Sequence, residues 1–326
     1  MKVFLTGGTG FIGGHVATKL RARGDGVVAL VRSLEKGAPL AQMGCELVVG
    51  SLSDEDAIAS GLEGCDAAIH GAAIYEVGIP DGRREAMREA NVEGTEGVLG
   101  AALEAGTSRV VYISTVAAFG DTHGEVVDET HEHPGESFTT YYEQTKYEAH
   151  QVALGLIEQG LPCVIVQPGA VYGPYDHSQL GNLTKQTLAG KLPLIPFPDF
   201  GLVIVHVEDV ADGVLLALDA GRMGERYVLG GDVTTNRELI QTVAELGGRK
   251  PPTHSLPTAL IKAIAPAGRF VGPPMGFPPN MRELVRSTDG VTFWASSDKA
   301  KKELGYTPRD LRTTIADTLK ETGKLA

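Results

Sequence analysis

The strongest constraint on the fold is a glycine-rich turn that follows the first apolar run of the chain. After Val3–Leu5 the sequence reads TGGTGFIG, and helical spacing then begins. Glycines permit a tight turn and a close approach of the main chain, and a helix that starts there offers free N–H groups and a partial positive charge. The arrangement predicts a turn that binds a diphosphate. The residues expected around it are Gly7, Gly10, Phe11, Ile12 and Gly13.

Apolar runs of strand length alternate with amphipathic stretches of helix length through the first half of the chain. This pattern predicts right-handed βαβ units and an α/β fold with a doubly wound parallel sheet. The expected strands are Val3–Leu5, Val27–Val31, Leu47–Val49, Ala67–His70, Val110–Ile113 and Val164–Val166. The expected helices lie near Gly13–Arg23, Glu55–Leu62, Glu85–Ala105 and Tyr142–Gln159.

From Pro168 onward, frequent prolines interrupt the alternation of strand-length and helix-length segments, which predicts a second, smaller C-terminal domain. One later stretch, the strand Leu202–Val207 with the helix Glu208–Ala220, regains the earlier pattern and is expected to return to the first domain. The expected boundaries are 1–170 with 203–222 for the dinucleotide-binding domain, and 171–202 with 223–326 for the substrate-binding domain.

The charge balance of the 326 residues excludes several classes of partner. The formal net charge is −12, which repels nucleic acid and anionic membrane surfaces. No apolar run reaches the ~18–20 residues of a membrane span, and the N-terminus does not read as a signal peptide. We therefore expect a cytoplasmic protein without nucleic-acid or membrane partners.

Cysteine and histidine spacing predicts neither a disulfide nor a metal site. Cys45, Cys65 and Cys163 are odd in number, lack CxxC spacing and lie in or beside apolar runs. The pair His131 and His133 flanks a glutamate, yet no further ligand is evident, and structural zinc generally needs four.

The end of the second strand indicates which dinucleotide the turn would bind. An acidic residue there would bind the ribose 2′-hydroxyl of NAD, whereas an arginine suits the 2′-phosphate of NADP. This strand ends in Val31 and Arg32, and Asp25 lies at its other end. We expect NADP, with NAD as the alternative, because a lone arginine can also be an ordinary solvated loop cation.

Two further motifs place reactive groups near this cofactor. Tyr142 and Lys146 are four residues apart and share one face of the fourth long helix. Ser114 and Thr115 follow the fifth strand, at the carboxyl edge of the sheet where ligands bind in such folds. A hydroxyl, a phenol and an ammonium are thus expected to converge near the nicotinamide.

Taken together, the motifs resemble the extended short-chain dehydrogenases/reductases of the NAD-dependent epimerase/dehydratase superfamily. The resemblance covers nearly the whole chain. The matching stretches are TGGTGFIG, HGAA (70–73), NVEGT (91–95), VVYISTVAAFG (110–120), YEQTK (142–146), QPGAVYGP (167–174), HVEDVADG (206–213) and SDKAKKELGY (297–306).

The resemblance implies a role for each motif residue. Tyr142 would be the general acid/base, Lys146 would lower its pKa and bind the nicotinamide ribose, and Thr115 would orient the substrate oxygen. The family also favours a homodimer. Where NAD-using members usually carry aspartate this chain has Val31, which strengthens the NADP interpretation. The further expected cofactor contacts are Ser51, Leu52, Ala72, Asn91, Ser114, Pro168, Gly169 and Val171.

The sequence favours a small, largely apolar substrate. The strand 200–205 lacks the arginine that sugar-nucleotide members of the family bring to a diphosphate, and Leu256–Ile264 is apolar. Tyr75 and Tyr172 are candidate substrate contacts, with ordinary core packing as the alternative. The resemblance is greatest to the branch of the dihydroflavonol reductases and 3β-hydroxysteroid dehydrogenases, which implies NADPH-dependent reduction of a ketone or aldehyde. A sugar epimerase or dehydratase with a tightly held cofactor, including the hopanoid-associated type, is the alternative, and a non-catalytic redox sensor is a third.

Overall fold

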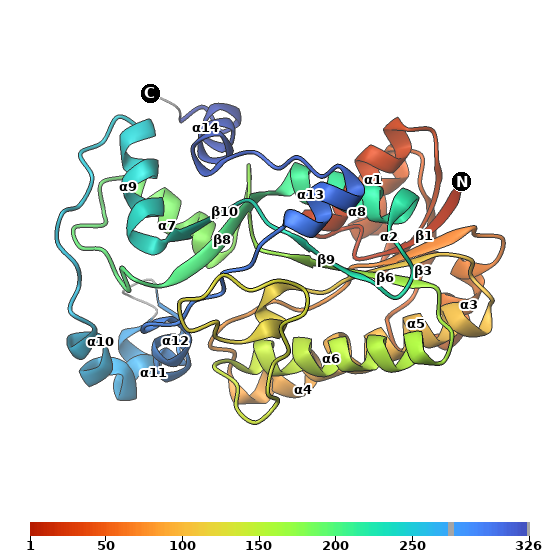
Figure 1. Ribbon diagram of the computed structural model, residues 1–326, viewed down its shortest axis with the longest axis horizontal. Coiled ribbons are helices and arrows are strands. Elements are labelled where there is room, and N and C mark those ends of the chain that lie inside the picture. The colour runs from red at the N-terminus through yellow and green to blue at the C-terminus, as the bar shows by residue number, and fades with distance from the viewer. Residues whose placement is uncertain (273–276, 325–326) are drawn as a thin grey trace.

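The large sheet has seven parallel strands in the order β3-β2-β1-β4-β5-β6-β9 (Figure 1). The computed structural model describes residues 1–272 and 277–324. Helices cover both faces of this sheet, so the predicted α/β, doubly wound class is confirmed. The strands are β1 (Lys2–Thr6), β2 (Gly26–Val31), β3 (Glu46–Val49), β4 (Ala67–His70), β5 (Val110–Ile113), β6 (Cys163–Pro168) and β9 (Arg226–Leu229).

Two helical layers bury the two faces of the sheet in separate apolar cores. Side chains alternate between the faces, so Val111 lies in one core and its neighbour Tyr112 in the other. One face packs against α1 (Phe11–Ala22), α2 (Leu34–Gln42), α8 (Val207–Ala220) and α13 (Asp298–Leu304). The other packs against α3 (Glu55–Leu62), α5 (Gly94–Glu104) and α6 (Tyr141–Glu158), and the short elements before α5 are η1 (Asp81–Arg83), α4 (Arg84–Arg88) and η2 (Glu89–Glu93).

A second lobe lies beyond the carboxyl ends of the large sheet, on the left in Figure 1. Its sheet has the order β10-β8-β7, in which β8 runs parallel to β7 and antiparallel to β10. One apolar cluster of this lobe lies beneath α7, α9 and α14, and another joins α10 and α12. The elements are β7 (Ala170–Tyr172), α7 (Gln179–Leu188), β8 (Gly201–His206), β10 (Asp232–Thr235), α9 (Asn236–Leu246), α10 (Thr258–Ile264), η4 (Ala265–Ala267), α11 (Gly268–Val271), α12 (Met281–Thr288) and α14 (Leu311–Glu321).

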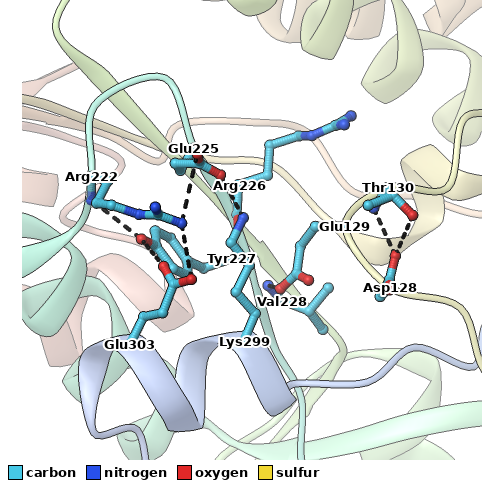
Figure 2. A network of polar contacts seen from close by, with 10 residues as sticks. All are labelled: Asp128, Glu129, Thr130, Arg222, Glu225, Arg226, Tyr227, Val228, Lys299 and Glu303. Carbon is cyan, nitrogen blue, oxygen red and sulfur yellow. Dashed lines mark hydrogen bonds and ion pairs between the residues drawn. The ribbon is translucent and has the colours of Figure 1, made fainter.

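Strand β9 closes one edge of the large sheet, and polar side chains contact its backbone on the edge that faces away from β6 (Figure 2). The buried Glu129 accepts a hydrogen bond of 2.7 Å from the Val228 N–H, in place of a neighbouring strand. Lys299 of α13 donates to the Arg226 carbonyl at 2.7 Å. These side chains form hydrogen bonds with backbone N–H and carbonyl groups that an open sheet edge would leave unpaired.

Several sequence predictions about individual elements are wrong. Residues 226–229 form strand β9 of the large sheet, where no strand was expected. Strand β8 belongs to the small sheet, although it was expected in the first domain, whereas α8 packs against α1 on the large sheet. The expected single helix Glu85–Ala105 is interrupted by the π-turn η2. The domain boundaries themselves stay a prediction.

Within the described residues, no helix is both long and apolar enough to cross a membrane. The same part of the chain holds no group of three His, Cys, Asp or Glu side chains arranged for a metal ion. His133 instead pairs with Glu143 at 3.3 Å and stacks on Phe138, and Glu132 pairs with Arg226 at 2.8 Å.

Candidate active site

The glycine turn joins β1 to α1 at the carboxyl edge of the large sheet. Gly7 has a φ of +78°, and a Cβ there would lie 2.6 Å from the Gly71 carbonyl carbon. A Cβ at Gly13 would lie 2.2 Å from the Gly7 carbonyl oxygen. No side chain caps the N-terminus of α1 at Gly10, and its first turn carries no acidic residue. The turn therefore fits a dinucleotide diphosphate, because its N–H groups are left for an anion and glycine is required for the close approach.

The residues expected near the adenosine end of the cofactor lie at the ends of β2 and β3. Arg32 is exposed directly after β2, and no ion pair holds it among the residues that the structure describes. The Ser51 hydroxyl lies 2.8 Å from that of Ser53. Leu52 packs beneath α5, since a Cβ at Gly94 would lie 2.8 Å from the Leu52 Cδ1. Arg32 follows the strand that pairs with β1, and within the part of the chain that the structure describes its guanidinium has no acidic partner, so it is available to an anionic group.

Tyr142 lies in the first turn of α6, which Thr140 caps by accepting a hydrogen bond from the Glu143 N–H at 2.9 Å. Burial raises the pKa of the Tyr142 phenol, while a hydrogen bond with Thr115 lowers it. The ring of Tyr75 meets the Tyr142 ring edge-on, with 4.8 Å between centroids. The phenol is therefore protonated at neutral pH and lies between a hydroxyl and an aromatic ring.

Lys146 is buried one helical turn after Tyr142, on the side of α6 that faces the sheet. Its Nζ donates to the Tyr112 hydroxyl at 3.1 Å and to the Ile113 carbonyl at 3.2 Å. Within the described ranges no carboxylate pairs with this ammonium, so its charge is available to the region around the phenol. The predicted lowering of the Tyr142 pKa by Lys146 stays a prediction, because burial raises the pKa of this phenol here.

Asn91 occupies the π-turn η2 and ties three segments together. Its amide accepts from the Ile74 N–H at 2.7 Å and donates to the Ile74 carbonyl at 3.0 Å. The amide also donates to Thr145, the residue before Lys146, at 3.0 Å. The extra residue of the π-turn thus directs Asn91 at both the loop that carries Tyr75 and the helix that carries Lys146.

Two buried histidines support the strand ends beneath this region. His70 lies between the hydroxyls of Thr6 and Thr95, at 2.7 and 3.1 Å. His150 lies 3.1 Å from the Ser114 hydroxyl. Burial lowers the pKa of each histidine to about 3, so both are neutral at physiological pH. Their hydrogen bonds favour a structural role.

The remaining predicted residues are spread over two lobes. The Ala72 N–H donates to the Thr6 hydroxyl at 3.3 Å, beside the glycine turn. Pro168 ends β6, and Gly169 follows where a Cβ would lie 2.3 Å from the Val203 carbonyl oxygen, with Val171 in β7. Tyr172 is buried in the core of the second lobe, where its hydroxyl donates to Thr184 at 3.0 Å. The structure therefore does not bring Tyr172 together with Tyr75 beside Tyr142.

Sequence reasoning missed two residues that touch this constellation. Tyr112 was assigned only to a strand, yet its hydroxyl holds Lys146, and its position in the YIST stretch was the available signal. Glu283 accepts a hydrogen bond of 3.1 Å from the Tyr141 N–H at the start of α6. It is 142 positions away in the chain, and no local pattern marks it.

Comparison with known proteins assigns the family. The model described as the NAD dependent epimerase/dehydratase family matches residues 3–230. The chain belongs to this family. A Synechocystis protein, named provisionally as a dihydroflavonol 4-reductase, is 33% identical over 323 residues, which are 97% of this chain and 93% of that protein.

Two further similarities extend over the full length. A Stigmatella aurantiaca protein named 4-hydroxy-2-methyl-3-oxo-4-farnesyl-3,4-dihydroquinoline-1-oxide ketoreductase is 31% identical, over 99% of this chain and 97% of that protein. The crystal structure of gox2253 superposes with a TM-score of 0.84 and 37% identity, over 99% of each chain. The resemblance to extended short-chain dehydrogenases/reductases is thus confirmed, and the protein is an NAD(P)-binding enzyme of that type.

Proposed function

We propose that this enzyme transfers hydride from NADPH to the carbonyl carbon of a small, largely apolar ketone or aldehyde, with Tyr142 donating the proton to the carbonyl oxygen. The observation that carries the proposal is the position of Tyr142 in the first turn of α6, one helical turn before the buried Lys146, with the Tyr75 ring edge-on at 4.8 Å between centroids. A general acid must hold its proton at the working pH, and burial keeps this phenol protonated.

Other residues of the chain would bind the cofactor and orient the substrate. The turn from Gly7 to Gly13 would hold the diphosphate, and Arg32 would pair with the 2′-phosphate of NADP. The bound nicotinamide would supply the hydride. Lys146 would hold the ribose hydroxyls and stabilise the phenolate left after proton transfer, since among the described residues its ammonium has only neutral partners. Thr115 would hold the carbonyl oxygen against the Tyr142 hydroxyl.

The apolar substrate class is supported by the second lobe. Phe197 and Ile261 are buried there in one apolar cluster with residues of α12. Val77 packs against this cluster and comes from the loop that also carries Tyr75. Strand β8 contributes Leu202 to Val205 and no cation. A sugar diphosphate placed beside β8 would bury charge without a partner from this strand, at a cost of several kcal/mol. An aromatic or alicyclic ketone would carry no such cost.

The test is a panel of hydrophobic carbonyl compounds in an NADPH-oxidation assay, with UDP-glucose and UDP-galactose in parallel. We expect measurable NADPH oxidation with members of the panel, and no calorimetric binding of either UDP-sugar. Micromolar binding of a UDP-sugar, or a cofactor that stays bound through purification and is recycled in every turnover, would instead support the epimerase or dehydratase reaction.

A further inference from the structure

The side chain of Glu283 joins α12 of the second lobe to two segments beside Tyr142. It is only 3% exposed. Its Oε1 accepts hydrogen bonds from the Tyr141 N–H at 3.1 Å and from the Gly78 N–H at 3.3 Å. Tyr141 is the first residue of α6, and Gly78 follows Tyr75 by three residues. A single oxygen atom of α12 therefore touches both segments that place aromatic rings at the site.

Further contacts hold this carboxylate in place. Its Oε2 accepts from the Asn280 amide at 3.1 Å and lies 3.6 Å from the Arg84 guanidinium. That guanidinium also lies over the Tyr141 ring, 5.2 Å from its centroid. A second residue of α12, Arg286, donates to the Thr139 carbonyl at 2.8 Å, just before α6 begins. These contacts fix α12 against the N-terminus of α6.

The loop after β4 is shaped for this contact. Gly78 has a φ of +74°, and a Cβ there would lie 2.9 Å from the Cβ of Pro278. Only glycine therefore lets the loop approach the segment before α12 closely enough for its N–H to reach Glu283. The opposite side of α12 carries Leu284 and Val285 into the apolar cluster of the second lobe.

We propose that Glu283 is a positioning residue, which aligns Tyr142 and Tyr75 with a substrate held by the apolar lobe. The Tyr141 N–H is one of the helix-terminal donors that lack a partner within the helix, so Glu283 determines where the first turn of α6 lies. The proposal rests on the proposed reaction, because the alignment matters only if Tyr142 acts on the substrate. Glu283 itself touches neither substrate nor cofactor.

Glu283→Ala should lower kcat by about 10- to 100-fold, because a displacement near 1 Å of a catalytic group has effects of this order. KM and the dissociation constant of NADPH should stay within about threefold of wild type, since ground-state binding does not depend on the alignment. Glu283→Gln keeps an amide oxygen for both N–H donors and should retain kcat within about threefold. Val243→Ala, in the core of α9, serves as a control for destabilisation alone.

Hydrogen exchange of the Tyr141 and Gly78 amides provides a readout that does not need turnover. Both amides should exchange at least about tenfold faster in Glu283→Ala, and at the wild-type rate in Glu283→Gln and Val243→Ala. Unchanged exchange in Glu283→Ala would overturn the proposal, as would a kcat loss no larger than that of Val243→Ala. An inactive wild type would refute the proposed reaction, while the exchange rates would still test the contact.

Discussion

Gly13→Ala and Gly14→Ala add the same methyl group at adjacent positions of α1, but only the first clashes with the backbone of the glycine turn. The Cβ at position 13 would lie 2.2 Å from the Gly7 carbonyl oxygen, whereas at position 14 the nearest atom is 3.6 Å away. Real Cβ atoms essentially never approach closer than 3.0 Å, so α1 and the turn must separate by about 0.8 Å in the first variant.

Comparing the two variants cancels the intrinsic helix preference of alanine over glycine. Alanine is more favourable than glycine inside a helix by about 1 kcal/mol, and both variants gain this amount. Gly13→Ala also carries an overpacking cost of about 1–3 kcal/mol. The free energies of unfolding should therefore differ by about 1–3 kcal/mol, with Gly14→Ala the more stable.

Urea unfolding and NADPH titration by fluorescence measure the two consequences. The separation of α1 from the glycine turn moves the N–H groups of α1 away from a bound diphosphate. Gly13→Ala should therefore bind NADPH at least about tenfold more weakly. Gly14→Ala should bind as wild type. Equal stability and equal NADPH affinity of the two variants would refute the assignment of this turn.

Two further predictions concern pH and cofactor choice. Burial lowers the pKa of His70 and His150 to about 3 and that of His206 to about 4 in the folded protein, against about 6.5 in the unfolded chain. The unfolded chain binds more protons below pH 6.5, so stability is full above this pH and falls toward pH 4, by up to about 1.4 kcal/mol per pH unit for each histidine. Urea unfolding at several pH values should show this slope, which His150→Gln should reduce, and a flat profile would contradict it. Arg32→Ala should weaken NADPH binding by at least about tenfold and leave NADH binding unchanged; an unchanged ratio of the two affinities would show that Arg32 does not select the cofactor.

The sheet strands were predictable because each is a short apolar run bounded by turn signals. All six expected strands are present as β1 to β6, and Ala67–His70 and Val110–Ile113 have the predicted bounds. Strand β9 was not predicted as a strand of the large sheet, because its four residues are no different in pattern from an isolated strand, and the helix α8 that leads to it follows a strand of the other sheet. Helix α2 was missed because Gly37 and Pro39 lie inside it.

The candidate site likewise contains some residues that the sequence predicts and others that it does not. Tyr142 and Lys146 could be recognised because helix geometry fixes residues four apart on one face. Glu283 could not be recognised from the sequence, because its partners Gly78 and Tyr141 come near it only when the two lobes pack together. The π-turn around Asn91 was also not predicted, because the Asn91 hydrogen bonds join it to Ile74 and Thr145, which are distant in the sequence.

The central claim is that Tyr142 donates the proton in NADPH-dependent carbonyl reduction. The most direct test compares wild type and Tyr142→Phe under saturating NADPH, with the best ketone from the panel, because only the phenol oxygen is lost. General acid catalysis contributes about 10²–10⁴-fold, so kcat should fall by at least about 100-fold while the dissociation constant of NADPH stays within about threefold. A Phe variant that retains more than about a tenth of the wild-type rate would contradict the account.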